Sequence, residues 1–525
     1  MTEILAQSFA AVADPNVLLV VLGAAVYGTL FGSIPGLSAT MAVALVVPLT
    51  YFLSPLAALA AVITLEACAI SAGDIPSALM RIPGTPASAA YANDLYALAQ
   101  RGQYYRALGT CVMFSAIGGL FGAAVLIFLA QPFARLATVS TVAEYFWFYV
   151  IGLGCAVVVT RGSALKGACS LLLGLLFSTV GLSAVHTEAR FTFGHPELYQ
   201  GINFIPAMIG LFGLSEVLRA VSRRGGPAPR IAPVAPPAAT GPSRLQSLAR
   251  QHLIGPWRDV FGGSLDLLWR RPVRTLQCNA IGTLIGILPG AGADIAAWVS
   301  FGYSKRRSRT PEEYGRGSIE GVADAGAANN AALAGAWIPA LVFGIPGDSI
   351  TAIVLGIMMM KNLSPGPEIF QQQAVLVHSL YIIFVLANLA LIPAGWLAIR
   401  AGGQLVRVPR HTLIPIVVMF CVIGAYAING SYFDVGLMLV MGVVGFLLER
   451  GQFPVGPVVL GIVLGGPLEE RFIQAMTASR GSPSVFVSRP VAAVLALAAV
   501  VVWLLPVITA VRTRAASRPL EEAPR

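Results

Sequence analysis

The chain has 525 residues, of which 56% are hydrophobic and only 11% are charged, and its mean hydropathy is +0.77. Soluble domains carry roughly 25% charged residues, so this composition excludes an ordinary soluble protein and predicts a polytopic integral membrane protein. The net charge of +10 comes from arginine-rich segments between apolar runs, such as Arg270, Arg271 and Arg274. Such segments orient a chain in the bilayer, so we expect lipid, and not nucleic acid, as their partner.

Catalytic and metal-binding patterns are missing from the sequence. The six cysteines lie singly in apolar segments, the five histidines are scattered, and neither H-E-x-x-H nor G-x-S-x-G occurs. We therefore expect no catalytic residue, no metal site and no cofactor. The N-terminus lacks the basic start of a secretory signal, so we expect the first span to be retained.

The apolar runs predict the elements in chain order. A span needs about 20 apolar residues, and the runs leave room for about ten to twelve spans. In the first half they cover residues 17–52, 56–82, 108–130, 145–159, 165–185 and 202–220, with a polar helix expected over 93–106. Residues 222–255 are proline-rich and read as an extended linker. The second half opens with an amphipathic surface helix over 257–269. Its apolar runs are 276–303, 323–344, 349–360, 375–399, 413–427, 435–448, 455–464 and 491–511, before a disordered tail at 513–525.

The two halves, residues 1–221 and 256–512, resemble each other. Gly32–Ala42 aligns with Gly286–Ala296, and the segment ending at Pro83-Gly84 aligns with the one ending at Pro346-Gly347. The offsets are 254 residues from Pro35 to Pro289 and 263 from Pro83 to Pro346. We therefore expect an all-α fold of two related repeats, inverted relative to each other, with broken helices or re-entrant hairpins at the Pro-Gly pairs.

The four Pro-Gly pairs predict a transport site. Proline and glycine together stop a helix, and at membrane depth the freed N–H and C=O groups are tolerated only inside protein or against a water-filled cavity. Secondary transporters place such breaks around a midplane solute site, and the N-terminus of the following half-helix favours an anion. We expect alternating access between the two repeats, with the Pro-Gly tips meeting around the solute.

The expected substrate-binding residues are these pairs and the small or polar residues that follow them. Each polar one is equally compatible with an ordinary helix N-cap. The set is Pro35, Gly36, Ser38, Thr40, Pro83, Gly84, Thr85, Ser88, Pro289, Gly290, Gly292, Asp294, Gly347, Asp348, Ser349 and Thr351.

Two further features leave alternatives open. Basic clusters flank 276–303 on both sides, and its arms of about 13 residues span only about 20 Å. This favours a re-entrant hairpin with its tip at Pro289-Gly290 over a single broken span. Asn329 and Asn330 lie in an apolar segment and need partners. They either join helices or help to bind a coupling ion or the substrate.

Several stretches carry a family resemblance. They are Pro35–Leu45, Ile82–Ala90, Ile285–Ala293, Ala328–Ala332, Gly344–Gly347 and Pro365–Pro367, followed by Phe453-Pro454, Leu464-Gly465 and Arg489-Pro490. In these stretches, in order and over nearly its whole length, the chain resembles the large membrane subunit (TctA-like) of the bacterial tripartite tricarboxylate transporters.

The resemblance implies a three-part uptake system in the bacterial inner membrane. A periplasmic binding protein captures a di- or tricarboxylate-like organic acid, this subunit forms the path, and a small four-span membrane subunit assists. A Na⁺ or H⁺ gradient drives uptake, and no G-x-x-x-x-G-K-[S/T] motif for ATP occurs. The oligomeric state, including a homo-oligomer, is left open. A stand-alone carboxylate transporter without a binding protein is the alternative, and a membrane-embedded enzyme is the third class.

The sequence departs from the family pattern at two charged positions. Asp74 stands where the family usually has Ser, and Arg81 where it usually has Asn. They are seven residues apart, about two helical turns, and an isolated charge in a membrane is costly. We therefore expect them to pair with each other, the alternative being that Arg81 binds a substrate carboxylate. Glu66, earlier in the same segment, is expected to face either a neighbouring helix or the proton or sodium path.

Overall fold

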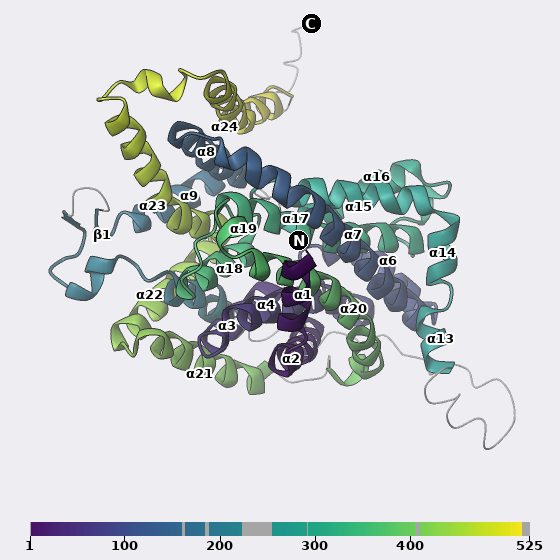
Figure 1. The fold of residues 1–525 in the computed structure, drawn as a ribbon. Helices are drawn as coiled ribbons and strands as arrows, with labels where there is room; N and C mark the ends of the chain where they lie inside the picture. The colour runs from purple at the N-terminus through teal and green to yellow at the C-terminus, as the bar shows by residue number, and fades with distance from the viewer. Residues whose placement is uncertain are drawn as a thin grey trace, which may run out of the picture. The chain divides into compact units, whose positions relative to one another are not determined.

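The computed structural model describes residues 2–159, 163–183, 188–222, 255–290, 292–405 and 410–516. These residues are almost entirely helical (Figure 1). The rest comprises turns and loops, short 3-10 turns and the two-residue strands β1 (Gly181–Leu182) and β2 (Ala189–Arg190), which pair antiparallel. An all-α fold is therefore confirmed. Most of the expected linker, 222–255, and of the expected tail, 513–525, lies outside the described residues.

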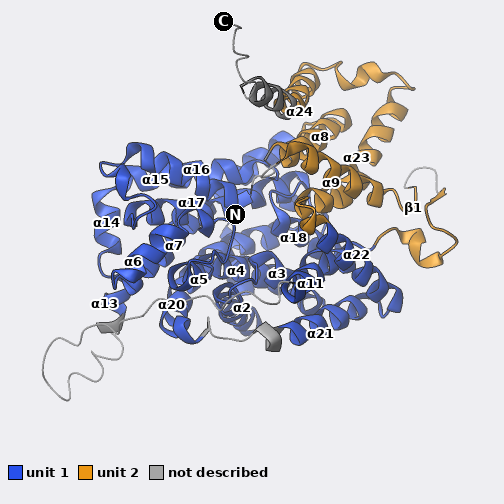
Figure 2. Cartoon of the chain, turned by 180° about the vertical axis from the view of Figure 1, so that it is seen from behind, with its two compact units in different colours: residues 1–138, 203–447 blue, residues 139–202, 448–525 orange. Residues whose placement is uncertain are grey.

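The chain divides into two compact units (Figure 2). Unit 1 holds residues 1–138 and 203–447, and unit 2 holds residues 139–202 and 448–525. Each unit thus combines residues from both halves of the sequence. The division into repeats, 1–221 and 256–512, concerns internal similarity and stays a prediction.

Unit 1 contains most of the helices. They are α1 (Thr2–Val12), α2 (Pro15–Ser33), α3 (Ala39–Thr50), α4 (Pro55–Ala72), α5 (Asp74–Met80), α6 (Ala92–Gln100), α7 (Tyr104–Thr138), α10 (Phe204–Met208), the π-helical turn η3 (Ile209–Leu214), α11 (Ser215–Ser222), α13 (Gly255–Phe261), α14 (Ser264–Arg270), α15 (Pro272–Ile287), α16 (Gly292–Arg307), α17 (Ile319–Phe343), α18 (Ser349–Met360), α19 (Ile369–Gln372), α20 (Ala374–Leu405), α21 (Arg410–Asn429) and α22 (Tyr432–Arg450).

Unit 2 contains α8 (Val142–Val159), α9 (Ala164–Ser178), α23 (Val455–Ala478) and α24 (Pro490–Ala516). α23 packs against α9, where Gly174 and Gly461 let the backbones approach. Arg190 of β2 donates two hydrogen bonds to the Glu469 carboxylate, at 2.8 and 3.0 Å, and Phe472 stacks on Phe486. The Arg489 guanidinium also forms an ion pair with the buried Glu144 carboxylate, at 3.2 Å. The unit is thus held by close backbone packing, ion pairs and aromatic contacts.

Six described helical stretches are long and apolar enough to cross a membrane: Pro15–Ser33, Pro55–Met80, Tyr104–Thr138, Phe204–Ser222, Ala374–Gln404 and Tyr432–Arg450. Shorter apolar helices, such as Ala39–Thr50 and Ser349–Met360, lie between them. The expected polytopic membrane character is confirmed, whereas the count of ten to twelve spans stays a prediction.

Two boundaries differ from the sequence-based expectations. The amphipathic segment 257–269 is two helices, α13 and α14, because Gly263 adopts a left-handed φ of 91° between them. At the other end, α24 continues to Ala516 and so includes the first four residues of the expected tail.

Glycines allow equivalent helix pairs in the two halves to approach closely. α2 packs on α4, where a Cβ added at Gly28 would lie 2.6 Å from the Leu65 carbonyl oxygen and one at Gly32 would overlap that of Ala69. α15 packs on α17 in the same way, with Gly282 against Ala328 and Gly286 against Ala332. Both glycine pairs are related by 254 residues and both partner pairs by 263. These are the offsets between the Pro-Gly pairs.

Helices α15 and α16 form a hairpin (Figure 1). Near its open end, Arg274 of α15 donates a hydrogen bond to the carbonyl oxygen of Arg307 of α16, and Tyr303 donates one to Gln277 at 2.9 Å. Pro289 and Gly290 lie at the opposite end, between the two helices. The two basic ends of this segment therefore lie side by side, as the hairpin interpretation requires.

A buried ion pair clamps the hairpin to α17. Arg271 donates to Asp324 Oδ2 at 2.9 Å, and Ser304 of α16 donates to the same oxygen. The side chain of Asp324 is 0% exposed and that of Arg271 is 13% exposed. One carboxylate on α17 thus holds both arms of the hairpin.

A second carboxylate ties down the loop between α16 and α17. Asp94 Oδ1 of α6 accepts backbone N–H groups from Gly315, Gly317 and Ser318, each at 2.8 Å. Burial raises the pKa of the Asp94 carboxyl above its ordinary value, and the backbone N–H groups partly offset that rise. The loop that enters α17 is thereby fixed to α6.

Substituting Gly32 by alanine is expected to destabilise the protein, because the added methyl would overlap the α4 backbone at Ala69. Overpacking of this kind costs about 1–3 kcal/mol. Gly23 on the same helix has no atom within 4 Å of an added Cβ, so Gly23→Ala is the matched control. Melting temperatures of the detergent-purified variants test this. Equal melting temperatures for the two variants would contradict the packing argument.

Alanine substitutions at the neighbouring Arg270 and Arg271 are expected to differ sharply in their effect on stability. Arg271→Ala leaves the buried Asp324 charge uncompensated, at a cost of about 3–5 kcal/mol. Arg270 pairs with Asp266 at the surface, with side chains 73% and 60% exposed, and Arg270→Ala is expected to change little, as is usual for surface ion pairs. Thermal unfolding of both variants measures the difference. A melting temperature lowered equally by both would rule out the clamp.

Candidate functional site

The first Pro-Gly pair forms the turn between α2 and α3. Gly36 adopts a φ of 89°, which favours glycine, and the Leu37 N–H donates to the Ile34 carbonyl oxygen at 3.2 Å. Ser38 caps α3, its Oγ accepting the Met41 N–H at 3.1 Å. Thr40, in the first turn of α3, is half-buried. The turn therefore ends at a helix N-terminus that is capped by Ser38. An ordinary N-cap is the alternative to substrate binding that the sequence left open for this residue.

The second pair folds back on the kink between α4 and α5. The Gly84 N–H donates to the Gly73 carbonyl oxygen at 3.1 Å, and any side chain at Gly84 would meet the Gly73 backbone. Thr85 and Ser88 are buried and exchange hydrogen bonds of 3.1 Å between the backbone N–H of each and the side-chain hydroxyl of the other. Pro83 is exposed, whereas the turn that follows it is largely buried and held by hydrogen bonds between its own residues.

The third and fourth pairs differ in how they end. Pro289 and Gly290 lie at the tip of the α15–α16 hairpin, with Gly290 at φ 77° and Gly292 at φ 61°. Asp294, in the first turn of α16, is half-buried. In the fourth break Asp348 and Thr351 form a capping box at the start of α18: Asp348 Oδ1 accepts the Thr351 N–H at 2.8 Å and Thr351 Oγ1 accepts the Asp348 N–H at 2.9 Å. Ser349 is half-buried beside them.

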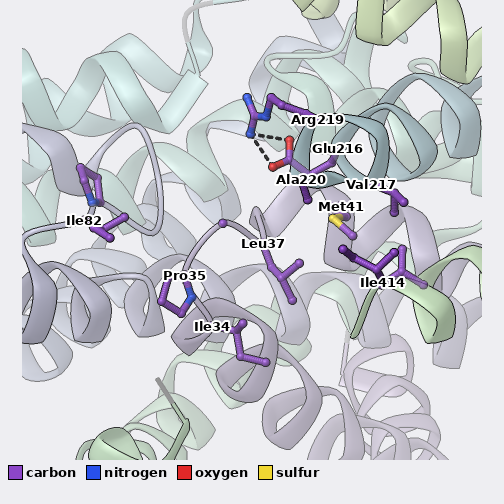
Figure 3. Close-up of a pocket in the computed structure, with 13 residues that line it drawn as sticks. Ile34, Pro35, Leu37, Met41, Ile82, Glu216, Val217, Arg219, Ala220 and Ile414 are labelled. Carbon is purple, nitrogen blue, oxygen red and sulfur yellow. Dashed lines mark hydrogen bonds and ion pairs between the residues drawn. The ribbon is translucent and has the colours of Figure 1, made fainter. Parts of the chain in front are cut away.

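Contacts link the first break to the second, the second to the third and the third to the fourth. The first two line one pocket (Figure 3). The Trp298 indole of α16, which follows the third break, donates to the Pro86 carbonyl oxygen in the second break at 3.1 Å. A Cβ added at Gly292 in the third break would lie 3.2 Å from Asp348 Cβ in the fourth. Segments more than 200 residues apart in sequence are thereby joined at their helix breaks.

The pocket has a volume of about 820 Å³, counting the part that opens to solvent. The two breaks supply Ile34, Pro35, Gly36, Leu37, Ile82 and Pro83, and α11 and α21 supply Glu216, Val217, Arg219, Ala220, Ile414 and Val417. Figure 3 shows Glu216 and Arg219 on one side and Pro35, Leu37 and Ile82 across from them. An apolar pocket with one charge pair suits a small anion whose charge meets the guanidinium.

Sequence reasoning missed Glu216 and Arg219 as site residues. Arg219 belongs to another of the arginine-rich segments between apolar runs, and such segments predict membrane orientation and not a binding site. In the structure the π-helical turn η3 directly precedes α11, and the Arg219 guanidinium forms an ion pair with Glu216. Single π-helical turns are frequent at functional sites. The sequence of such a turn carries no clear local signal, because the turn depends on the helices that pack against it.

Asp74 and Arg81 do not form the expected ion pair. Arg81 ends α5 in a left-handed conformation, with φ 58°, which turns the chain away from the helix axis. Its Nε donates to Asn93 Oδ1 at 2.8 Å, while Asp74 is buried close to Tyr91 and Cys111. The two-turn spacing argument fails because the helix stops at Met80.

Asn329 and Asn330 lie in the middle of α17 and are almost wholly buried. Asn329 Oδ1 and both polar side-chain atoms of Asn330 have no hydrogen-bond partner among the described residues. Buried amides normally have hydrogen-bond partners, so these unpartnered atoms are compatible with an ion or substrate as the missing partner. That role of Asn329 and Asn330 stays a prediction. No group of three or more His, Cys, Asp or Glu side chains that could bind a metal gathers in the described part of the chain.

Comparisons with known proteins place these features in a family. The family model described as tripartite tricarboxylate transporter TctA family matches residues 18–460. An Agrobacterium vitis protein described as an uncharacterized 52.8 kDa protein in the TAR-I ttuC' 3' region is 34% identical over 490 residues, covering 93% of each chain. A second protein of that organism, from the TAR-II ttuC' 3' region, is 38% identical over 234 residues, which is 44% of this chain and 97% of the relative.

No solved structure matches the chain. The family match covers all four Pro-Gly pairs, α11 and α17, and the first relative extends over nearly the whole length. The chain is therefore a polytopic membrane protein that belongs to the TctA family of tripartite tricarboxylate transporters.

Proposed function

We propose that the chain is the translocation subunit of a secondary transporter that imports a di- or tricarboxylate-like organic acid, driven by an ion gradient. A periplasmic binding protein delivers the acid and a small four-span membrane subunit assists, in the bacterial inner membrane. The observation that carries the proposal is the joining of four helix breaks from both halves of the chain, through the shared pocket, Trp298 and Gly292. Secondary transporters bind their solutes at such discontinuous helices.

Related packing in the two halves supports a mechanism of alternating access. Gly28 and Gly32 on α2, and Gly282 and Gly286 on α15, make corresponding contacts at the same sequence offsets as the Pro-Gly pairs. Such correspondence is what two repeats of one ancestral unit would produce. The α15–α16 hairpin, with both basic ends together, favours a re-entrant segment over a single broken span. In this mechanism the hairpin tips carry the solute past a packed scaffold.

The pocket indicates how a carboxylate would be recognised. Arg219 offers a guanidinium, and the lining includes Leu37 and Met41, which flank the Ser38-capped N-terminus of α3. Arginine binds carboxylates by paired, charge-assisted hydrogen bonds. In the structure its partner is the Glu216 carboxylate. An incoming acid would therefore compete with Glu216 for Arg219.

Dependence on a binding protein separates the proposal from a stand-alone carboxylate transporter. The chain, reconstituted in vesicles with the small membrane subunit, is expected to accumulate labelled citrate, malate or tartrate only when the periplasmic binding protein is added and an ion gradient is present. Vesicles without the chain are the control. Full uptake without the binding protein would favour the stand-alone alternative, and release of a chemically altered acid would favour an enzyme.

Two substitutions in the pocket are expected to act in opposite directions. Arg219→Gln removes the guanidinium, and losing a hydrogen bond to a charged group costs about 1.5–3 kcal/mol, which is a rise of about tenfold to a hundredfold in the KM for uptake. Glu216→Gln removes the internal competitor and is expected to leave KM unchanged or lower it. Arg270→Ala, a surface arginine, is the matched control. A parallel rise of KM in both pocket variants would indicate a general packing defect and not carboxylate recognition.

A further inference from the structure

A closed loop of unit 2 connects α9 to the span that follows it. It runs from Gly181 to Gly201, and the structure describes residues 181–183 and 188–201 of it. The two ends of the loop meet, because a Cβ added at Gly181 would lie 2.8 Å from the Gly201 Cα. Strands β1 and β2 pair within the loop, and the 3-10 turn η2 (Pro196–Gln200) closes it. The loop is therefore a compact feature of the surface.

Large apolar side chains of this loop are exposed instead of packed. Phe193 is 83% exposed, Phe191 54% and Tyr199 42%. Thr192, between the two phenylalanines, is buried, so the chain presents both rings outwards. Figure 2 shows the segment at β1 projecting from the helices of unit 2. Exposed aromatic groups gathered on one loop indicate a contact site.

Both phenylalanines have left-handed backbone conformations, at φ 51° for Phe191 and φ 49° for Phe193. Such conformations are unfavourable for bulky residues. Six non-glycine residues in the described part of the chain have positive φ, and the other four are Arg, Asn or Gln. The loop is held in this form by the ion pair of Arg190 with α23 and by the His195 N–H, which donates to the Thr192 carbonyl oxygen at 2.9 Å. Strain that keeps apolar rings exposed points to a function at this surface.

The distribution of basic residues assigns the loop to the outer side of the membrane. The span Phe204–Ser222 follows the loop, and four arginines lie at the far end of that span, between Arg219 and Arg230. At the far end of α9, which precedes the loop, lies Lys166. The loop itself carries one arginine, Arg190, and two glutamates. Because the more basic ends of spans face the cytoplasm, the loop faces the opposite side.

We propose that Phe191, Phe193 and Tyr199 form the docking surface for the periplasmic binding protein. Aromatic anchors inside a polar rim are typical of protein–protein contacts, and the exposed Glu188 and Glu197 lie on the same loop. A bilayer fits this surface less well. Membrane anchors combine Trp and Tyr with basic residues, whereas two glutamates would repel anionic headgroups.

This inference rests on the proposed function, which requires a binding protein at the outer face, and deepens it by assigning the contact surface. The chain itself links that surface to the pocket. The loop leads into Phe204–Ser222, and the last turns of this span carry Glu216 and Arg219. The docking surface and the pocket thus belong to opposite ends of one span, and the binding protein releases its acid at the outer end.

Docking can be measured without transport, as binding of the periplasmic binding protein to the chain and its small subunit in nanodiscs. Phe191→Ser and Phe193→Ser are each expected to raise the Kd by about tenfold to a hundredfold, as the loss of a central aromatic anchor does. Tyr432→Ser is the matched control and should leave the Kd unchanged. Tyr432 is 81% exposed and begins a span that ends at the basic Arg450. A wild-type Kd in both phenylalanine variants would overturn the docking surface.

The molecule that Phe193 contacts can be identified directly. A photoreactive benzoylphenylalanine in place of Phe193 keeps an aromatic ring at this position. Illumination in the presence of excess binding protein is expected to join the two proteins covalently. Adducts to phospholipid instead would make the loop a membrane anchor, and adducts to a second copy of the chain would make it a dimer interface. Either result would overturn the proposal.

Uptake of labelled citrate by the complete reconstituted system separates the docking surface from the proposed function. Phe193→Ser is expected to need more binding protein for half-maximal uptake but to reach the wild-type maximal rate, because the pocket is unchanged. Wild-type uptake without any binding protein would refute the proposed function in its present form. Wild-type uptake that requires the binding protein, with an equal requirement in Phe193→Ser, would refute the docking surface alone.

Discussion

Backbone groups freed where helices stop inside an apolar protein must find partners, and this constraint organises the rest of the structure. The breaks meet it with local hydrogen bonds. The Gly84 N–H turns back to Gly73, the Gly366 N–H reaches the Leu341 carbonyl oxygen, and Asp348 with Thr351 closes the start of α18. Since an unsatisfied group costs several kcal/mol in such surroundings, these turns are rigid features that hold side chains in place, and not loose ends.

Close backbone approach is the second consequence. α2 lies on α4, and α15 on α17, at distances that only glycine permits. Small residues spaced four apart are the usual device for helix contact in membranes, where hydrophobic attraction between helices is absent. Because Gly32 and Gly286 lie three residues before Pro35 and Pro289, these contacts determine where the first and third breaks are held. Packing and site geometry are therefore set by the same glycines.

Buried carboxylates are handled in several distinct ways. Asp324 is neutralised by Arg271, Asp94 by backbone N–H groups, and Asp434 by amides. Each arrangement ties two segments together and has an evident structural purpose. Glu66 differs, because neither of its carboxyl oxygens has a hydrogen-bond partner among the described residues, and Asp74 Oδ1 is likewise unpartnered.

The sequence alone determined the membrane class, the helical fold, the helix breaks and the family, because these follow from apolar runs, from the backbone chemistry of Pro-Gly pairs and from motifs in order. The repeated G-x-x-x-G of α2 and α15 was also readable, at Gly28 and Gly282. Only tertiary structure decided which groups meet. Arg81 does not pair with Asp74 because α5 ends at Met80, between the two residues. Arg219 lines the pocket because α11 packs near two turns that are distant from it in the sequence. Trp298 and Pro86 are 212 residues apart, and no local pattern encodes their hydrogen bond, since contacts at that separation depend on how whole helices pack.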